Sequence, residues 1–256
     1  MQESLPAKKN ISVSILFLLV LLQTALSILP GVLLYHQQDG ENWQGAALLI
    51  FYLFVSNFSE LTVRMQYKKQ TRFPMVAYGI KLLICSVLII FFASQTQWQF
   101  ALILFGYELF QTLANSKQYF YLDSFYYTLL NPIFKGLVLN LLFLMKAPIF
   151  FDIHQITALL PALLASLTLT LFQQGQVSQR NRKSIFVIGF ALSTLLSLVG
   201  IFYLHYSYDF FDLWRVVSFA VFLVIATFFT FRQNHFLKAE IALNLFYLVG
   251  LGLLYF

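Results

Sequence analysis

The chain has 256 residues, of which 60% are hydrophobic, 18% are aromatic and only 10% are charged. Soluble domains carry about 25% charged residues, so this composition excludes an ordinary soluble enzyme and indicates a protein whose main solvent is a lipid bilayer. The net charge of +6 comes from short basic clusters between apolar runs, a pattern typical of membrane topology and not of a nucleic-acid-binding surface.

Apolar runs of membrane-spanning length follow one another along the chain. They predict an all-α polytopic membrane bundle of eight to nine transmembrane helices, with residues 1–256 forming a single transmembrane domain. The first run is too long for the apolar core of a signal peptide, so it is interpreted as an uncleaved span that Pro30 and Gly31 kink or end. The expected spans cover about residues 11–35, 46–63, 75–94, 100–115, a fifth ending near residue 146, 156–172, 185–204, 216–231 and 241–256.

The stretch before the fifth span, residues 117–136, is aromatic and mixed in polarity. Pro132 and Gly136 are expected to break a helix there, and tyrosine side chains suit the headgroup boundary. We therefore expect an interfacial segment that leads into the fifth span.

The charges separate cleanly when nine spans alternate across the membrane. Thirteen of the sixteen Lys and Arg residues then fall on the side of the N-terminus, and Asp39, Glu41, Asp152, Asp209 and Asp212 fall on the other side. Basic loops stay in the cytoplasm. The sequence thus predicts an integral protein of the plasma membrane with a cytoplasmic N-terminus and an external C-terminus.

The first candidate site lies at the end of the second span. Asn57, Glu60 and Arg64 share one helix face, and the loop that follows carries Lys68 and Arg72. Such a basic mouth can hold a phosphate or diphosphate headgroup. The alternative is that the basic residues set topology and contact anionic lipids nonspecifically, with Glu60 and Arg64 forming an ordinary i,i+4 helix pair.

The loop after the sixth span, QQGQVSQRNRKS, supplies the second half of this candidate site. Gln176, Arg180 and Lys183 are its candidate headgroup ligands. The four histidines are scattered and no pair has ligand spacing, so no metal site is predicted from them.

Four polar residues fall inside expected spans: Lys81 in the third, and Glu108, Gln111 and Asn115 on one face of the fourth. A charge within the bilayer is costly unless it is paired, and Lys81 is the expected partner of Glu108. The pair is either structural or part of a proton or ion relay. The two amides line a polar cavity or form interhelical hydrogen bonds.

These features together resemble the UbiA superfamily of intramembrane aromatic prenyltransferases. The segment SNFSELTVRMQYKKQTRFP stands where that family has its first Asp-rich motif, after helix two. QQGQVSQRNRKSIFVIG stands where it has its second, after helix six, and Lys183, Ser184 and Gly189 fit the tail of that pattern. The Tyr-rich link YYTLLNPIFKG is similar to the family's third cytoplasmic loop.

The resemblance implies an enzyme that transfers a polyprenyl diphosphate to an aromatic quinone precursor, with Mg²⁺ held by carboxylates. Here, however, Phe58 replaces an aspartate of the first motif. Glutamines stand in the second segment where aspartates are expected: Gln173, Gln174, Gln176 and Gln179. A neutral amide cannot supply the charge that Mg²⁺ needs, so the sequence argues against this cofactor and leaves open a homologue that only binds the diphosphate.

Two other classes of protein stay open. The first is the membrane permease subunit of a transporter, of the ABC exporter, lipid or bacteriocin-immunity type. The second is a noncatalytic scaffold. Expected partners are membrane lipids and an isoprenoid diphosphate, without nucleic acid; the sequence identifies neither a catalytic residue nor an oligomeric state.

Overall fold

The computed structural model describes residues 13–37, 43–68, 75–115, 122, 124–144, 153–178, 180–233 and 235–256, without the side chains of residues 67, 68, 75, 115 and 180–182. Every regular element in these ranges is helical. The helices are α1 (Val13–Gln37), α2 (Trp43–Lys68), α3 (Met75–Gln95), α4 (Trp98–Asn115), α5 (Phe125–Pro132), η1 (Ile133–Val138), α6 (Leu139–Leu144), α7 (Ile153–Ala158), α8 (Leu160–Val177), α9 (Arg180–Tyr208), α10 (Leu213–Arg232) and α11 (Phe236–Tyr255).

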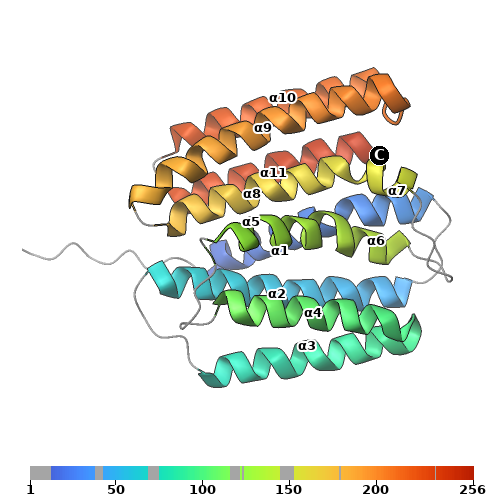
Figure 1. The fold of residues 1–256 in the computed structure, drawn as a ribbon, viewed down its shortest axis with the longest axis vertical. Helices are drawn as coiled ribbons and strands as arrows, with labels where there is room; N and C mark the ends of the chain where they lie inside the picture. Colours follow the sequence, from blue (N-terminus) through green and yellow to red (C-terminus); the bar gives the residue numbers. More distant parts are fainter. Residues whose placement is uncertain are drawn as a thin grey trace, which may run out of the picture.

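The helices lie side by side as roughly parallel rods (Figure 1). α5, η1 and α6 follow one another without a break, and only Leu159 separates α7 from α8. α1 packs against α2, α6 and α11, so it lies in the middle of the bundle. Short links reverse the chain direction, which gives the bundle two ends. We call the end with Lys183, Arg232 and Lys238 the basic end, and the end with Asp209 and Asp212 the acidic end.

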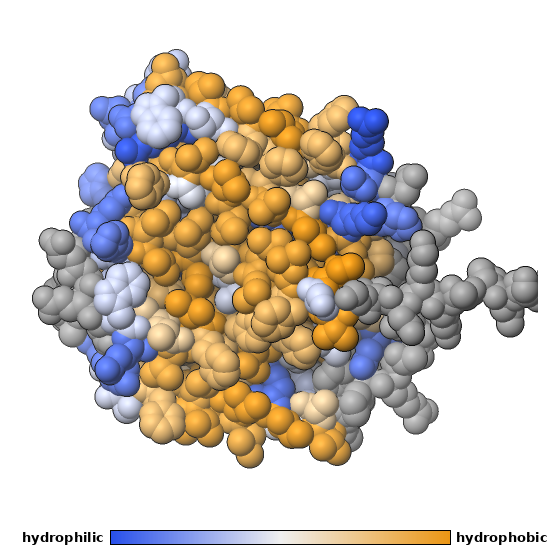
Figure 2. All heavy atoms as spheres, turned by 180° about the vertical axis from the view of Figure 1, so that it is seen from behind, coloured by the Kyte–Doolittle hydropathy of each residue, from blue (hydrophilic) through white to orange (hydrophobic). Residues whose placement is uncertain are grey.

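The surface of the bundle confirms the expected membrane class. In the part of the chain that the structure describes, seven helices are long and apolar enough to cross a membrane: α1, α2, α3, α9, α10, α11 and the continuous rod Phe125–Leu144. A broad hydrophobic belt lies between hydrophilic residues at the two ends (Figure 2). Large apolar side chains on the membrane-length helices are exposed, among them Leu83 on α3, Leu195 on α9 and Phe228 on α10. The protein is therefore an integral membrane protein with a helical bundle.

The expectation of an interfacial segment ending at Pro132 and Gly136 is wrong. Phe125–Leu144 is one rod long enough to span a membrane, and it passes through both residues. Proline removes one backbone donor, and a wider π-helical turn accommodates the change locally, as it often does in membrane helices. Of the two alternatives for Pro30 and Gly31, a kink or a helix end, the helix end is excluded, because α1 continues to Gln37.

Asn140 joins this rod to α1. Its Oδ1 accepts a hydrogen bond from the Gly31 backbone N–H at 2.7 Å, and its Nδ2 donates to the Ser27 carbonyl at 2.9 Å. The close approach requires glycine, because a Cβ on Gly31 would lie 2.9 Å from the Asn140 Cα atom. Gly136 is equally constrained, since its Cβ would lie 2.6 Å from the Cα atom of Leu163 on α8.

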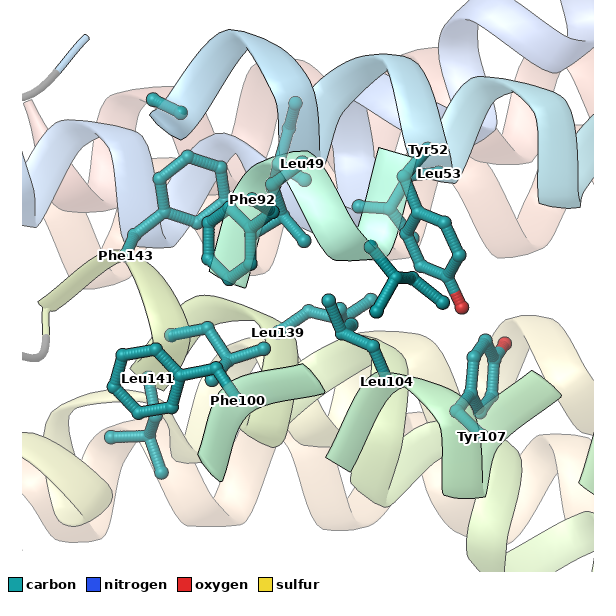
Figure 3. Packing of buried hydrophobic residues seen from close by; sticks show 14 of the residues in the cluster. Leu49, Tyr52, Leu53, Phe92, Phe100, Leu104, Tyr107, Leu139, Leu141 and Phe143 are labelled. Carbon is teal, nitrogen blue, oxygen red and sulfur yellow. The ribbon is translucent and has the colours of Figure 1, made fainter. Parts of the chain in front are cut away.

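Apolar packing fills the two halves of the bundle. One cluster of buried side chains joins α2, α3, α4 and α6 to α1. A second cluster joins α8, α9, α10 and α11 to α1. In the first cluster Leu53, Leu104 and Leu139 interdigitate from three helices, and the hydroxyl groups of Tyr52 and Tyr107 lie at the same edge of it (Figure 3). Polar side chains buried within the bundle form the candidate site.

Candidate functional site

Four charged side chains meet inside the bundle, and we call them the charge cluster: Glu60, Arg64, Lys135 and Glu240. They come from α2, η1 and α11. At most 12% of any of these side chains is exposed. Two acids and two bases balance, so the cluster carries no net formal charge, which lowers the cost of burying it.

Glu240 is the most heavily hydrogen-bonded member of the cluster. Its Oε1 accepts from Nη1 and Nη2 of Arg64, both at 3.0 Å. The same oxygen accepts from Nε2 of Gln23 at 2.8 Å and from Nε2 of Gln173 at 2.9 Å. One carboxylate oxygen therefore ties α11 to α1, α2 and α8. The other oxygen, Oε2, is buried and has no hydrogen-bond partner in the described structure.

Glu60 is satisfied on both oxygens. Oε1 accepts from the Tyr127 hydroxyl at 2.7 Å, and Oε2 pairs with Nζ of Lys135 at 2.6 Å. Tyr127 lies on α5 and Lys135 on the π-helical turn, so both donors come from the rod that the sequence interpretation placed at the interface. Glu60 and Arg64 thus each form an ion pair with another helix, in place of the i,i+4 pair that was one of the two alternatives.

This arrangement does not fit a Mg²⁺ centre. Both oxygens of Glu60 are committed to protein donors, and Oε1 of Glu240 accepts four N–H groups. Across the described ranges, no three His, Cys, Asp or Glu side chains group as metal ligands. Mg²⁺ takes several oxygen ligands, and the charge cluster offers one free carboxylate oxygen, Oε2 of Glu240, beside two cations.

The glutamines that replace the expected aspartates are part of the same hydrogen-bonded interior. Gln173 donates to Glu240, as described above. Gln174 donates to the Leu122 carbonyl at 2.8 Å and accepts from the Thr128 hydroxyl at 2.9 Å. Gln173 thus connects α8 to α11, and Gln174 connects α8 to α5. Carboxylates could not donate the hydrogen bonds that these amides donate.

Asn57 is also buried, and its Nδ2 donates to the Thr24 hydroxyl on α1 at 3.1 Å. Arg64 and Glu60, the two members of the charge cluster on α2, lie on the same side of that helix. The remaining predicted members of the first segment cannot be placed: Arg72 and the Lys68 side chain lie outside the described residues, as do the Arg180 and Asn115 side chains.

The predicted partner of Glu108 is confirmed, since Lys81 and Glu108 form a buried ion pair between α3 and α4. Gln111 lies on the same face and donates to the Tyr107 hydroxyl at 2.7 Å, and this hydroxyl lies 3.3 Å from Oδ1 of Asn131. The amide therefore takes part in interhelical hydrogen bonding between α4 and α5, as one of the two predictions stated.

A cavity at the basic end contains the other predicted residues. It has a volume of about 310 Å³, lies between α8, α9, α10 and α11, and is lined by Gln176 and Lys183. Most of its wall is aromatic or apolar: Phe172, Phe186, Phe190, Phe231, Phe236, Leu171, Val187 and Ala239. We call this cavity the basic-end pocket.

The polar atoms of the basic-end pocket come from Gln176, Lys183, Thr230 and Gln233. Nε2 of Gln176 is buried and has no acceptor in the described structure. Lys183 is exposed at the rim, and no described residue forms an ion pair with it. Buried donors are normally paired, so an acceptor from a ligand or from water is expected here.

Lys135, Glu240, Gln23 and Tyr127 were missed as site residues by sequence reasoning. Lys135 is one of the thirteen basic residues placed on the side of the N-terminus, and Glu240 directly precedes the ninth expected span, 241–256. A signal was present, because Glu240 stands near the start of the apolar run FLKAEIALNLFYLVGLGLLY, where an unpaired acid is costly. Its partner Arg64 lies 176 residues away in sequence, and no local spacing points to it.

No family model, curated protein or solved structure matches this chain. The assignment of a function therefore depends on the chemistry of the charge cluster and of the basic-end pocket.

Proposed function

We propose that this protein is a UbiA-like membrane protein that binds a polyprenyl diphosphate in the basic-end pocket and does not transfer it through a Mg²⁺ centre. In this proposal the chain crosses the membrane nine times, with α4 and α8 as the two spans that complete the seven apolar ones. The N-terminus and the basic end face the cytoplasm of the cell, and the C-terminus faces outward.

The observation that supports the proposal most directly is that donors without a partner and aromatic side chains line the same cavity. A diphosphate accepts hydrogen bonds from an amide and from an ammonium group, which Gln176 and Lys183 provide. The apolar walls suit the first isoprene units. A volume of about 310 Å³ is at the lower end for ligand sites, so the rest of the tail would lie along apolar helix faces in the bilayer.

The charge cluster supports binding without transfer. Ionising an allylic diphosphate requires cationic stabilisation of the leaving group by a metal held on free carboxylates. Glu60 and Glu240 are instead paired with Lys135 and Arg64. In this proposal the cluster holds the helices in place and the pocket holds the ligand.

Binding of radiolabelled geranylgeranyl diphosphate to the purified protein in uncharged detergent tests the proposal. We expect saturable binding that Lys183→Met weakens about tenfold, because a hydrogen bond to a charged group contributes about 1.5–3 kcal/mol. Lys238→Met is the matched control, since Lys238 is exposed at the same end but does not line the pocket. Geranylgeraniol, which lacks the diphosphate, should not compete.

Three results would overturn the proposal: no saturable binding, equal loss in the two lysine variants, or full competition by geranylgeraniol. Absence of binding would favour the permease hypothesis. Binding that requires Mg²⁺, together with prenylation of an aromatic acceptor, would show that transfer takes place and that the binding-only form is wrong.

The proposed orientation has its own test. Cys85 is the single cysteine and is buried, so single-cysteine variants are made in a Cys85→Ala background. A membrane-impermeant maleimide added to intact cells should label Asp212→Cys at the acidic end and should label Lys238→Cys only after permeabilisation. The reverse pattern would invert the topology, and labelling of both from outside would contradict it.

A further inference from the structure

A second cavity lies at the acidic end, at the opposite ends of α8 and α11 from the basic-end pocket. Its volume is about 330 Å³, and its walls come from α1, α6, α7, α10, α11 and the link before α10. We call it the acidic-end pocket. It contacts neither the charge cluster nor Lys183, so the function proposed above does not use it.

Hydrogen bonds between elements fix the walls of this pocket. Gln37 at the end of α1 donates to the Tyr255 carbonyl at 2.7 Å, and the Tyr255 hydroxyl donates to the Ala158 carbonyl at 2.6 Å. Nδ1 of His205 lies 2.7 Å from the Phe211 carbonyl, which holds the link before α10. These contacts join α1, α7, α9 and α11 around the opening, so the cavity is largely preformed.

The polar lining of the pocket favours an anion. Arg215, His154 and the amides of Gln37 and Gln155 line it, and no carboxylate is among its described lining residues. Nε of Arg215 is buried and makes no hydrogen bond. The Arg215 side chain is 28% exposed, so its guanidinium is accessible to an anionic ligand, which would give this N–H an acceptor.

Asp212, an acid close to Arg215, does not serve as the hydrogen-bond acceptor of Nε. Oδ2 of Asp212 lies 3.2 Å from Nε of Arg215, yet the two atoms do not form a hydrogen bond. The Asp212 side chain is 63% exposed, so solvent screens this i,i+3 pair. Asp212 also lies outside the pocket lining.

The apolar part of the lining is aromatic. Phe210, Phe211 and Tyr255 form part of the wall, with Phe211 and Tyr255 packed edge to face at 5.5 Å between ring centroids. Aromatic walls favour a ligand that is itself flat or apolar. We propose that the acidic-end pocket binds a small organic anion, an aromatic carboxylate, with Arg215 on its charged group and its ring against the wall formed by Phe210, Phe211 and Tyr255.

The test compares cinnamate with cinnamamide on the purified full-length protein in uncharged detergent, by titration calorimetry. The two probes have nearly the same shape and differ in charge. We expect cinnamate to bind at least about tenfold more tightly, because one charged hydrogen bond is gained. Equal binding of the acid and the amide, or no binding of either, would overturn the proposal without any variant being made.

Arg215→Gln should remove this preference for the acid. The matched control is Arg232→Gln, because Arg215 lies in the first turn of α10 and Arg232 ends the same helix at the basic end. The control should bind cinnamate as the parent protein does, and a thermal melt checks that both variants are folded. An unchanged affinity in folded Arg215→Gln would overturn the role of the guanidinium.

The same anionic chemistry is available from a free carboxylate or from an anionic lipid headgroup. Repeating the titration in nanodiscs of phosphatidylcholine, with and without phosphatidylglycerol, separates these sources. A weaker apparent affinity for cinnamate with phosphatidylglycerol would assign the pocket to a lipid headgroup, and an unchanged affinity would assign it to the free anion. A preference for cinnamamide in both membranes would overturn the proposal.

Discussion

Lys81 and Glu108 form an ion pair between two neighbouring helices. Arg64 instead pairs with Glu240, whose hydrogen bonds join the four helices α1, α2, α8 and α11. Both pairs are almost fully buried. They differ in connectivity, because Glu240 also accepts from Gln23 and holds Gln173 on α8. A buried pair between two helices is replaceable by apolar side chains, but a carboxylate with several donors is not, since each donor would lose its acceptor.

This difference separates structural charges from charges available to a ligand. The described acids inside the bundle each pair with a base, although one oxygen each of Glu108 and Glu240 has no hydrogen-bond partner. The two pockets contain donors without a hydrogen bond, Gln176 Nε2 and Arg215 Nε. The carboxylates of the interior thus connect helices, whereas the pockets at the two ends contain donors. Such ends are suited to anions.

The largest expected effect is that of Glu240→Met. It leaves Arg64, Gln23 and Gln173 without their common acceptor, and we expect it to lower the free energy of unfolding by about 3–5 kcal/mol. Denaturation of the purified protein in detergent measures the loss. The double variant Arg64→Met/Glu240→Met should recover only part of it, because the two glutamine amides stay unpaired. Complete recovery would contradict the four-helix role of Glu240.

Lys81→Met is expected to cost less, about 3 kcal/mol, because a single partner is left alone. The same denaturation assay applies. Here the double variant Lys81→Met/Glu108→Met should recover nearly all of the stability, or exceed that of the parent protein, since apolar side chains of similar volume replace an isolated pair well. If the two double variants recover to the same extent, connectivity does not distinguish the two regions.

The same contrast explains how far sequence reasoning reaches. Apolar length predicted the helical bundle, and two charges inside consecutive spans predicted Lys81 with Glu108, because neighbours in sequence pack side by side. The partner of Arg64 depends on how α11 packs against α1 and α2, which no spacing encodes. The rod through Pro132 was missed because proline was interpreted as a breaker, whereas a π-helical turn carries the helix past it.

The basic-end pocket, where we propose headgroup binding, was predictable only in part. Gln176 and Lys183 were singled out by their place in a basic loop, and they line one cavity. Their aromatic surroundings come from four helices, including Phe231 at the end of α10 and Phe236 at the start of α11, so the pocket appears only after packing. Arg64 was grouped with them because it is basic and close to a membrane surface, but its charge is directed to Glu240.

Asn140→Ala tests an uncharged junction, the one between α6 and α1. The change leaves the Gly31 N–H without its acceptor and removes a donor from the Ser27 carbonyl, so we expect a loss of about 2 kcal/mol in the same assay. Asn244→Ala is the control: Asn244 is equally buried, but it bonds only a carbonyl of its own helix, that of Glu240. An equal loss in the two variants would argue against an interhelical role of Asn140.

The smallest expected effect is that of Asp212→Asn, which removes an exposed partner of Arg215. Stability should change by less than about 0.5 kcal/mol, because a solvent-screened surface pair contributes little. Cinnamate binding should strengthen about twofold, since a negative charge near the guanidinium is removed. Asp209→Asn makes the same charge change without contacting Arg215, and its backbone at φ 52° suits asparagine, so it should leave cinnamate binding unchanged. Weaker cinnamate binding in Asp212→Asn would mean that Asp212 positions Arg215 for the ligand, and the pair would then belong with the structural charges of the interior.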